Sequence, residues 1–507
     1  MNEFKRKIKL LDHIVLEVIE KEKIPLVVSN QNFAEAHSRT VARLSQSAKS
    51  FEQIVKEILT DEGFDKEKIG KFHKGITLGV AHHSIEQHGN VTLCFENTSM
   101  LATNRYCENK RLAAYLEKST RYQDFSKPCY IIPKEFDLSE NKDLKEEYIE
   151  TMDFLFSTYA IILPKIISRI EKELENKNIT LDTKSIRKKA FDSARYILPA
   201  SAYTNFAITT NSQVFRSLIV DLLSNNITEF NEIGTEMQQE LIKVYPTLLE
   251  MDTCVINKER ERFKDSSSKI NPTSLNPNNN SNLKIDDIVF ENIESTVKII
   301  ENTRNSEKLL VYNYLLDLGY SVDYKENEVF LNNNILSTKD LEKYIKEAFN
   351  FDCTGYRPHR ALELANYTFE GIVDFGAWRD LHRNRMLTWI SSFVSPEYGF
   401  SIPVFLEDCR EEYLLGLKKA YSFWKKLVTR GFSKEFCQYV CPLATNAKIL
   451  YTINARELDH VSKTRTTEHA HFSYRSFVNK CVCEAEKINP EIIKHIKNYY
   501  KEPYSFT

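Results

Sequence analysis

The segment NARELDH at 454–460 places residues on one helix face that could bind a phosphate. Asn454 is a typical helix N-cap, and Arg456 and His460 then lie four residues apart on one helix face. Arginine offers a planar, permanently charged fork that suits phosphate oxygens. The alternative is an ordinary solvated helix face. The preceding apolar run YTI predicts a buried strand that leads into the helix, which favours the binding role.

Histidines and cysteines give weaker signals. His82, His83 and His88 form an HH-x4-H pattern without a carboxylate at a diagnostic spacing, which favours capping over metal binding. Of the ten cysteines, Cys481 and Cys483 are the one close pair, and their spacing is not that of a zinc site. We therefore expect no metal, and cysteines that are mostly reduced and buried.

The charge balance limits the class of partner. The 69 Lys and Arg residues nearly cancel the 71 Asp and Glu residues, which argues against a nucleic-acid coat or a basic membrane-surface protein. We find no apolar run near the roughly 18 residues that a membrane span needs. The N-terminus is charged and lacks the apolar core of a signal peptide. We expect a cytoplasmic protein that binds neither nucleic acid nor membrane.

The elements that position these residues fall into two blocks. The segment 265–282 is rich in Asn, Ser and Pro and predicts a linker or loop. It separates block one, residues 1–264, from block two, residues 283–507. A chain of 507 residues is long enough for each block to bury its own core.

The two blocks repeat each other. Each contains an alternating strand, VTLCF or YTFEGIV, and then a basic cluster, NKR at 109–111 or RNR at 383–385. Downstream, residues 197–211 align with 440–454 without a gap, at a constant offset of 243 residues. The first block carries about 31 extra residues between these matches, which we place in a helical insertion at about 139–190. One such match can arise by chance, but two in the same order favour a true repeat.

These segments resemble the flavin-dependent thymidylate synthase family. The resemblance covers most of both blocks and rests on AHHSIEQH at 81–88, EKSTRY at 117–122, LPASAYTNF at 198–206, WRDLHRNRM at 378–386 and NARELDHVSKTRTTEHAHF at 454–472. It implies an α+β fold of two tandem diverged copies, each a mixed sheet with flanking helices, that form a pseudo-dimer. The family's usual chain is a single domain that assembles as a homotetramer, so the resemblance implies a homodimer here.

The resemblance also implies which motif residues each block has kept. Block one keeps the substrate loop and the arginine before a Leu-Pro pair, namely Glu117, Ser119, Arg121 and Arg195, together with the flavin-side His88. It has lost the leading arginine of its basic cluster, and Gln213, Ser217 and Leu222 replace expected polar or basic residues. Block two keeps the complementary set, namely Arg383, Arg385, Asn454, Arg456 and Arg465, with Asn384 and His460 as replacements. Block two lacks the substrate loop, and Gln438 and Leu364 replace the counterparts of Arg195 and His88. Complementary losses predict one composite nucleotide site per chain.

By resemblance, the chain is an FAD-dependent, thymidylate synthase-like methyltransferase. It would transfer a one-carbon unit reductively to C5 of a pyrimidine nucleotide, dUMP by default, with methylene-tetrahydrofolate and NADPH. The implied substrate-binding residues are Glu117, Ser119, Arg121, Arg195, Arg383 and Arg465, of which Ser119 and Arg465 are catalytic. Arg465 would stabilise negative charge that develops at N3 and O4 of the pyrimidine. The implied FAD-binding residues are His88, Arg383, Asn384, Arg385, Asn454, Arg456 and His460.

Two alternatives remain open. The chain could be a non-catalytic or regulatory paralogue that binds a nucleotide or a flavin. It could also modify C5 of UMP or another pyrimidine nucleotide. Modification of tRNA uridine is disfavoured by the neutral net charge.

Overall fold

The computed structural model describes residues 7–10, 34–44, 47, 66–105, 107, 110–250, 257–258, 261–262, 292–350, 358–468 and 470–501. The predicted linker at 265–282 and Asn109 of the first basic cluster lie outside these residues. The chain divides into two compact units. Unit 1 comprises Met1–Ser119, Cys129–Ile149 and Ser201–Lys284, and unit 2 comprises Thr120–Pro128, Glu150–Ala200 and Ile285–Thr507. This division is by compactness, so part of block one, with Arg121 and Arg195, belongs to unit 2.

Unit 1 is built on a four-stranded antiparallel sheet. Its strands follow the order β1 (Lys7–Leu10), β2 (Asn90–Ser99), β4 (Tyr203–Asn211) and β3 (Ala114–Glu117). Alternate side chains such as Leu93 and Ile208 are buried, as a half-buried strand requires. Three helices pack against this sheet, namely α5 (Met100–Arg105), α8 (Ser212–Leu223) and α9 (Thr228–Leu241).

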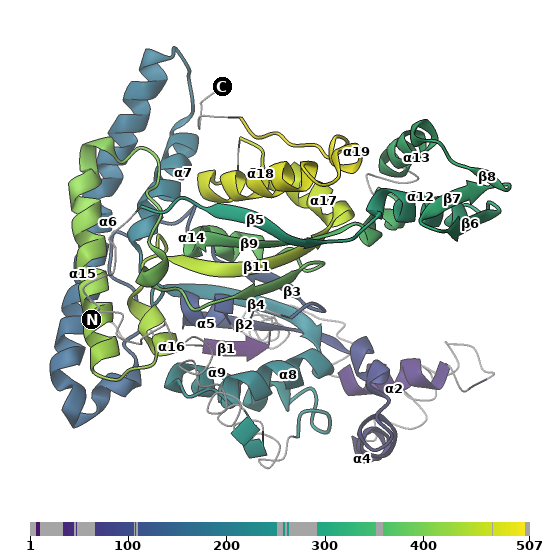
Figure 1. Ribbon diagram of the computed structural model, residues 1–507. Coiled ribbons are helices and arrows are strands. Elements are labelled where there is room, and N and C mark those ends of the chain that lie inside the picture. The colour runs from purple at the N-terminus through teal and green to yellow at the C-terminus, as the bar shows by residue number, and fades with distance from the viewer. Residues whose placement is uncertain are drawn as a thin grey trace, which may run out of the picture. The chain divides into compact units, whose positions relative to one another are not determined.

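Unit 2 repeats the same topology. Its sheet has the order β10 (Thr388–Ser391), β11 (Asn446–Asn454), β9 (Asn366–Asp374) and β5 (Thr296–Asn302). The helices α14 (Phe375–Leu381), α17 (Ala455–Arg465) and α18 (Phe472–Glu486) take the places of α5, α8 and α9. Figure 1 shows α18 lying along β5 and β9, with which it is in contact.

Local details of the two units match residue by residue. Asn90 pairs with Asn211 in unit 1, and Asn366 pairs with Asn454 in unit 2. The strand that ends at each second asparagine is followed directly by a helix. Asn211 caps α8 by accepting from the amide of Val214, and Asn454 caps α17 by accepting from the amide of Glu457. The predicted N-cap and the predicted repeat are therefore confirmed.

Equivalent segments of the two blocks also pair with each other inside unit 2. Pro199 forms an antiparallel bridge with Pro442. The amide of Ala200 donates to the carbonyl of Cys441 at 2.9 Å, and the amide of Leu443 donates to the carbonyl of Leu198 at 2.9 Å. These two bonds exchange under the offset of 243 residues, so the bridge lies on a local pseudo-twofold axis.

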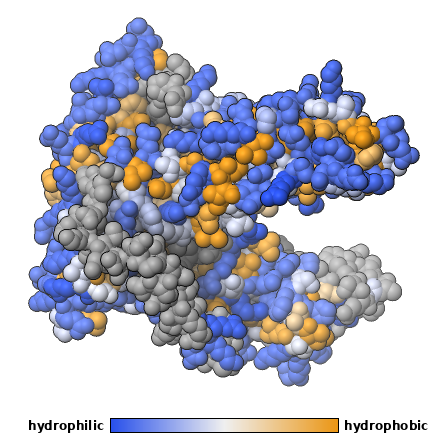
Figure 2. All heavy atoms as spheres, viewed as in Figure 1, coloured by the Kyte–Doolittle hydropathy of each residue, from blue (hydrophilic) through white to orange (hydrophobic). Residues whose placement is uncertain are grey.

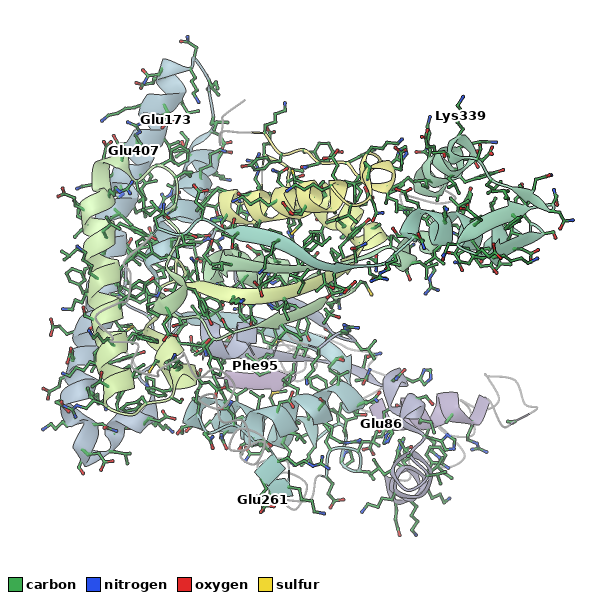
Figure 3. The ribbon with its side chains drawn as sticks, viewed as in Figure 1. Glu86, Phe95, Glu173, Glu261, Lys339 and Glu407 are labelled. Atoms are coloured by element: carbon green, nitrogen blue, oxygen red, sulfur yellow. The ribbon has the colours of Figure 1, made fainter. Side chains whose placement is uncertain are left out.

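A long helix, α6 (Lys142–Asn176), fills most of the predicted insertion and is followed by α7 (Thr183–Ala194). Block two has α15 (Arg410–Thr429) at the equivalent place, and the difference between 35 and 20 helical residues accounts for about half of the extra length. Within unit 2 the two helices pack together, since a Cβ on Gly416 would lie 3.4 Å from the methyl of Thr158. Arg169 lies between Glu173 and Glu407 near one end of this pair (Figure 3).

One helical segment among the described residues, Ser139–Asn176, is long and apolar enough by length and composition to cross a membrane. The sequence-based expectation that no stretch meets this measure was wrong. Half of its most apolar window is buried, and fully buried side chains such as Tyr148, Leu155 and Ile162 recur at helical spacing. The surface around the end of α6 at the upper left of the view is mainly hydrophilic (Figure 2). This pattern is that of a core helix.

Between β5 and β9, unit 2 carries a small subdomain that the sequence analysis did not predict. It consists of α12 (Ser306–Asp317), a three-stranded antiparallel sheet and α13 (Thr338–Asn350). The strands are β6 (Val322–Lys325), β7 (Glu328–Leu331) and β8 (Asn334–Ile335). Leu310, Val329 and Ile345 form its core.

Candidate functional site

Four arginines of unit 2 act electrostatically on the carboxylate of Asp380, which lies on α14. We call them the arginine cluster: Arg121, Arg195, Arg383 and Arg465. Burial alone would raise the pKa of Asp380, but the four guanidinium charges outweigh burial and lower this pKa. The sequence predicted all four as nucleotide ligands, and Arg195 and Arg383 lie 3.8 and 3.9 Å from this carboxylate. Two come from block one and two from block two.

Arg195 is the most buried member of the cluster, with 4% of its side chain exposed. It begins the short turn Arg195–Ile197 that follows α7. Its Nη1 donates to Thr120 Oγ1 at 2.9 Å. Its Nε and Nη2 have no hydrogen-bond partner among the described residues, although Asp192 Oδ1 and Asp380 Oδ2 lie at 3.9 and 3.8 Å. Buried donors without acceptors are costly, so this guanidinium is suited to receive an external anion.

Arg121 already has a strong internal partner. Its Nε and Nη2 donate to the two carboxylate oxygens of Asp192, both at 2.6 Å. Burial would lower the pKa of Arg121, but the charge and hydrogen bonds of Asp192 outweigh it and raise this pKa. The sequence analysis missed Asp192, which lies three residues before Arg195 on α7. Asp192 thus holds Arg121 in a fixed position beside Arg195.

A buried polar network supports this part of the cluster. His471 Nδ1 accepts from the amide of Ser473, so the proton is on Nε2, which donates to the carbonyl of Asp192 at 3.2 Å. Burial, with the charges of Arg195 and Arg121, lowers the pKa of His471 well below its usual range. His471 is therefore neutral and fixes the backbone that carries Asp192.

The second basic cluster forms the loop between α14 and β10. Arg383 is partly buried, and its Nη1 lies 3.9 Å from Asp380 Oδ1. Asn384 is buried, and its Nδ2 donates to the carbonyl of Leu381 at 2.8 Å. Arg385 is exposed. The loop thus places its two arginines in different environments.

The predicted residues of α17 are separated along the helix. Arg465, in its last turn, lies 5.6 Å from the ring centre of Tyr474, and its buried Nε has no hydrogen-bond partner among the described residues. Arg456, in the first turn, is roughly 14 Å away along the axis. Arg456 donates to the carbonyl of Pro358 at 2.8 Å and to Glu363 Oε1 at 2.6 Å. His460 is exposed. The structure therefore brings Arg465, and not Arg456, to the arginine cluster.

The remaining predicted residues belong to unit 1. Glu117, at the end of β3, is buried and accepts from Asn104 Nδ2 at 3.2 Å. Ser119 follows this strand and is partly exposed, and His88 is exposed at the end of the turn His83–His88.

Lys110 of the first block's basic cluster is paired with α8 in unit 1. Lys110 Nζ lies 2.5 Å from Asp221 Oδ2 and 3.0 Å from Ser217 Oγ, both on α8. Gln213, also on α8, accepts from Gln87 Nε2 at 3.1 Å. This is the local counterpart of the region around Asn384 and α17.

The histidine motif at 81–88 is tied to α8 through an ion pair between Glu86 and Arg216. The buried Glu86, labelled in Figure 3, accepts from Arg216 Nη2 at 2.6 Å, and its Oε1 lies 2.8 Å from His83 Nδ1. Within the described ranges there is no group of three or more His, Cys, Asp or Glu side chains arranged to hold a metal ion.

A cavity of about 430 Å³ lies elsewhere in unit 2. Its walls include Ser401, Ser473, Arg475, Lys480 and Tyr500. None of the residues predicted from the sequence lines it. The arginine cluster is therefore the candidate site on grounds of charge and unbonded donors, not of cavity size.

The comparisons with known proteins agree with the sequence resemblance. The sequence model of the family described as thymidylate synthase complementing protein matches residues 26–247 and 298–491. A UPF0159 protein of Chlamydia pneumoniae is 26% identical over 94% of this chain and 91% of its own length. A flavin-dependent thymidylate synthase of Clostridium tetani is 27% identical over 41% of this chain and 78% of its own. The full-length match to one relative and the half-length match to the other indicate a tandem fusion.

A solved structure, the UMP/dUMP methylase PolB from Streptomyces cacaoi bound with 5-Br dUMP, aligns with 40% of this chain and 95% of its own at 14% identity. Its TM-score is 0.32.

Proposed function

Because the chain belongs to the thymidylate synthase complementing protein family, we propose that it transfers a one-carbon unit reductively to C5 of a pyrimidine nucleotide. The nucleotide is dUMP by default, the carbon donor is methylene-tetrahydrofolate and the reductant is NADPH. The observation that carries this proposal is the arginine cluster, which combines two arginines from each block in one unit. Flavin-dependent thymidylate synthases are among the relatives, which supports a flavin cofactor, FAD.

Arg195 and Arg383 would bind the nucleotide phosphate. Arg195 lies 3.8 Å and Arg383 3.9 Å from Asp380. At these distances the carboxylate partly neutralises both guanidiniums but forms no hydrogen bond with either. Charge-assisted bonds from guanidinium to phosphate are short and strong. Arg121, with its fork on Asp192, would add positive charge.

Arg465 would act on the pyrimidine ring. Negative charge develops at N3 and O4 as C5 becomes nucleophilic, and a fixed guanidinium stabilises it without reorganisation. Ser119 would donate a further hydrogen bond to the nucleotide. Glu117, through its bond from Asn104, would fix the start of the loop that carries Ser119. In the net reaction, C5–H becomes C5–CH₃, methylene-tetrahydrofolate becomes tetrahydrofolate, and NADPH with one proton supplies two electrons.

The residues predicted for FAD fit this group in part. Arg383, Arg385 and Asn384 lie on one loop, and exposed Arg385 offers a full guanidinium to a phosphate or ring edge. Arg456 would have to leave Glu363 before it could bind FAD, whereas Asn454 already caps α17. His460 and His88 are exposed. When bound, FAD would carry the hydride equivalent from NADPH to the one-carbon unit.

The residues of unit 1 at the positions equivalent to the second basic cluster and to Arg465 support a single site per chain. There Lys110 is bound to Asp221 and Ser217, and Leu222 replaces the counterpart of Arg465. A phosphate bound at these positions of unit 1 would have to displace Asp221 from Lys110. The last turn of α8 would offer it no arginine, because Leu222 stands there.

A second candidate function is nucleotide binding without turnover. It is favoured by two ion pairs, Arg121 with Asp192 and Arg456 with Glu363, that occupy expected ligand arginines. Such a protein would bind a pyrimidine nucleotide through Arg195 but would not release the C5 hydrogen.

The test is tritium release from [5-³H]dUMP with added FAD, methylene-tetrahydrofolate and NADPH, with the nucleotide product identified by mass spectrometry. Release that depends on all three additions, and a product heavier by one CH₂, supports the enzyme. Saturable dUMP binding without release supports the binding protein. The same assay with UMP decides between the two sugars, and light scattering tests the expected homodimer.

A further inference from the structure

Asp380 lies beside Arg195 and Arg383 of the arginine cluster, and its contacts with both are long. Its Oδ2 is 3.8 Å from Arg195 Nη2 and its Oδ1 is 3.9 Å from Arg383 Nη1. These distances give Coulombic attraction but exceed a hydrogen bond. The side chain is 22% exposed, so part of the carboxylate faces solvent. In contrast, Asp192 holds Arg121 through two bonds of 2.6 Å.

The charges of this group suggest what Asp380 does. The four guanidiniums carry four positive charges, and Asp192 and Asp380 remove two of them. The remainder is close to the charge of a phosphate monoester, which is about −1.5 to −2 at pH 7. Without Asp380, the same arginines would repel one another more strongly and would favour ligands with more negative charge.

We propose that Asp380 is an internal counter-anion that tunes the arginine cluster to singly phosphorylated nucleotides. It stabilises the cluster when no ligand is bound, and it weakens phosphate binding in proportion to the charge of the ligand. Asp380 is thus a specificity-determining residue that need not touch the base or sugar. This inference rests on the proposed nucleotide site.

The experiment measures the affinities of dUMP, dUDP and deoxyuridine for the full chain and for Asp380→Asn by calorimetry at fixed ionic strength. Removing one negative charge a few ångströms from a dianion should tighten dUMP binding roughly tenfold in this partly screened setting. The gain scales with ligand charge, so a trianion such as dUDP should gain roughly thirtyfold. Uncharged deoxyuridine should be unaffected.

Two control variants separate charge from shape. Asp380→Glu keeps the charge and should leave the ratio of dUDP to dUMP affinity unchanged. Glu370→Gln removes a carboxylate that lies between Lys298 and Lys448 on the sheet of unit 2, and it should change no affinity. Without ligand, Asp380→Asn should melt at a lower temperature than the unmodified chain, because the cluster loses its counter-charge.

Weaker dUMP binding by Asp380→Asn, or an equal change for all three ligands, would overturn the inference. If the unmodified chain binds inorganic phosphate and pyrophosphate but no nucleotide, the proposed function fails, and those two ions replace dUMP and dUDP in the same comparison. If it binds none of them, both proposals fail.

Discussion

Replacing Arg195 with lysine should keep the charge of the arginine cluster but remove the donors that are suited to bind a phosphate. Arg195 is 4% exposed, and its Nε and Nη2 have no acceptor within hydrogen-bond range among the described residues. A lysine ammonium would still attract Asp192 and Asp380. It would present one point charge in place of a planar fork. The change therefore isolates bidentate geometry from net charge.

The magnitude follows from the contacts at stake. A hydrogen bond between charged groups contributes about 1.5–3 kcal/mol, which corresponds to roughly 10–150-fold in affinity. We expect Arg195→Lys to weaken dUMP binding by a factor in this range. The melting temperature without ligand should change little, because Thr120 loses one bond while two unsatisfied buried donors disappear.

The assay is calorimetric titration of dUMP, with thermal melting of the ligand-free protein alongside. Arg169→Lys is a matched control, since Arg169 pairs with Glu173 on α6 and with Glu407 in the turn before α15, and neither carboxylate pairs with a member of the cluster. Equal affinities for Arg195→Lys and the unmodified chain would refute the role of Arg195. A large loss of melting temperature would show instead that Arg195 is chiefly structural.

Two further predictions concern the two halves of the site and the first turn of α17. Arg121→Ala and Arg465→Ala should each weaken dUMP binding roughly 10–150-fold, and the double variant should fall short of their combined effect, because both act at one site. Lys110→Ala should have little effect; strictly additive losses, or a damaging Lys110→Ala, would argue against a composite site. Burial raises the pKa of Glu457 to about 7, above its ordinary 4.5. As pH rises, Glu457 therefore ionises in the unfolded chain before it ionises in the folded chain, so its contribution to stability falls between pH 4.5 and about 7. Glu457→Gln should flatten this decline in thermal melts measured over that pH range. Parallel pH profiles for the two proteins would contradict the prediction.

The sequence predicted those parts of the fold that depend on local pattern. Alternation identified the strands that became β2 and β9, and Asn454 was correctly expected to cap a helix. The constant offset between the blocks aligned Pro199 with Pro442, but it did not predict that the two residues form a bridge. Contact between equivalent segments depends on tertiary structure.

The parts that the sequence did not predict are long-range pairs. Asp192 and Asp380 lie on helices, where acidic residues are usually solvated, so their positions beside arginines carried no local signal. Arg456 looked like a free phosphate ligand, but Glu363, 93 residues away, binds it. The grouping of Arg121 and Arg195 with unit 2 likewise depends on which segments pack together.

The central claim is that one nucleotide site per chain is built from both blocks. Its most direct test is the stoichiometry of dUMP binding, measured by calorimetric titration of the full-length protein with saturating FAD. The arginine cluster, together with the paired Lys110 and Asp221 in unit 1, predicts one dUMP per chain. Two equivalent sites per chain would contradict it.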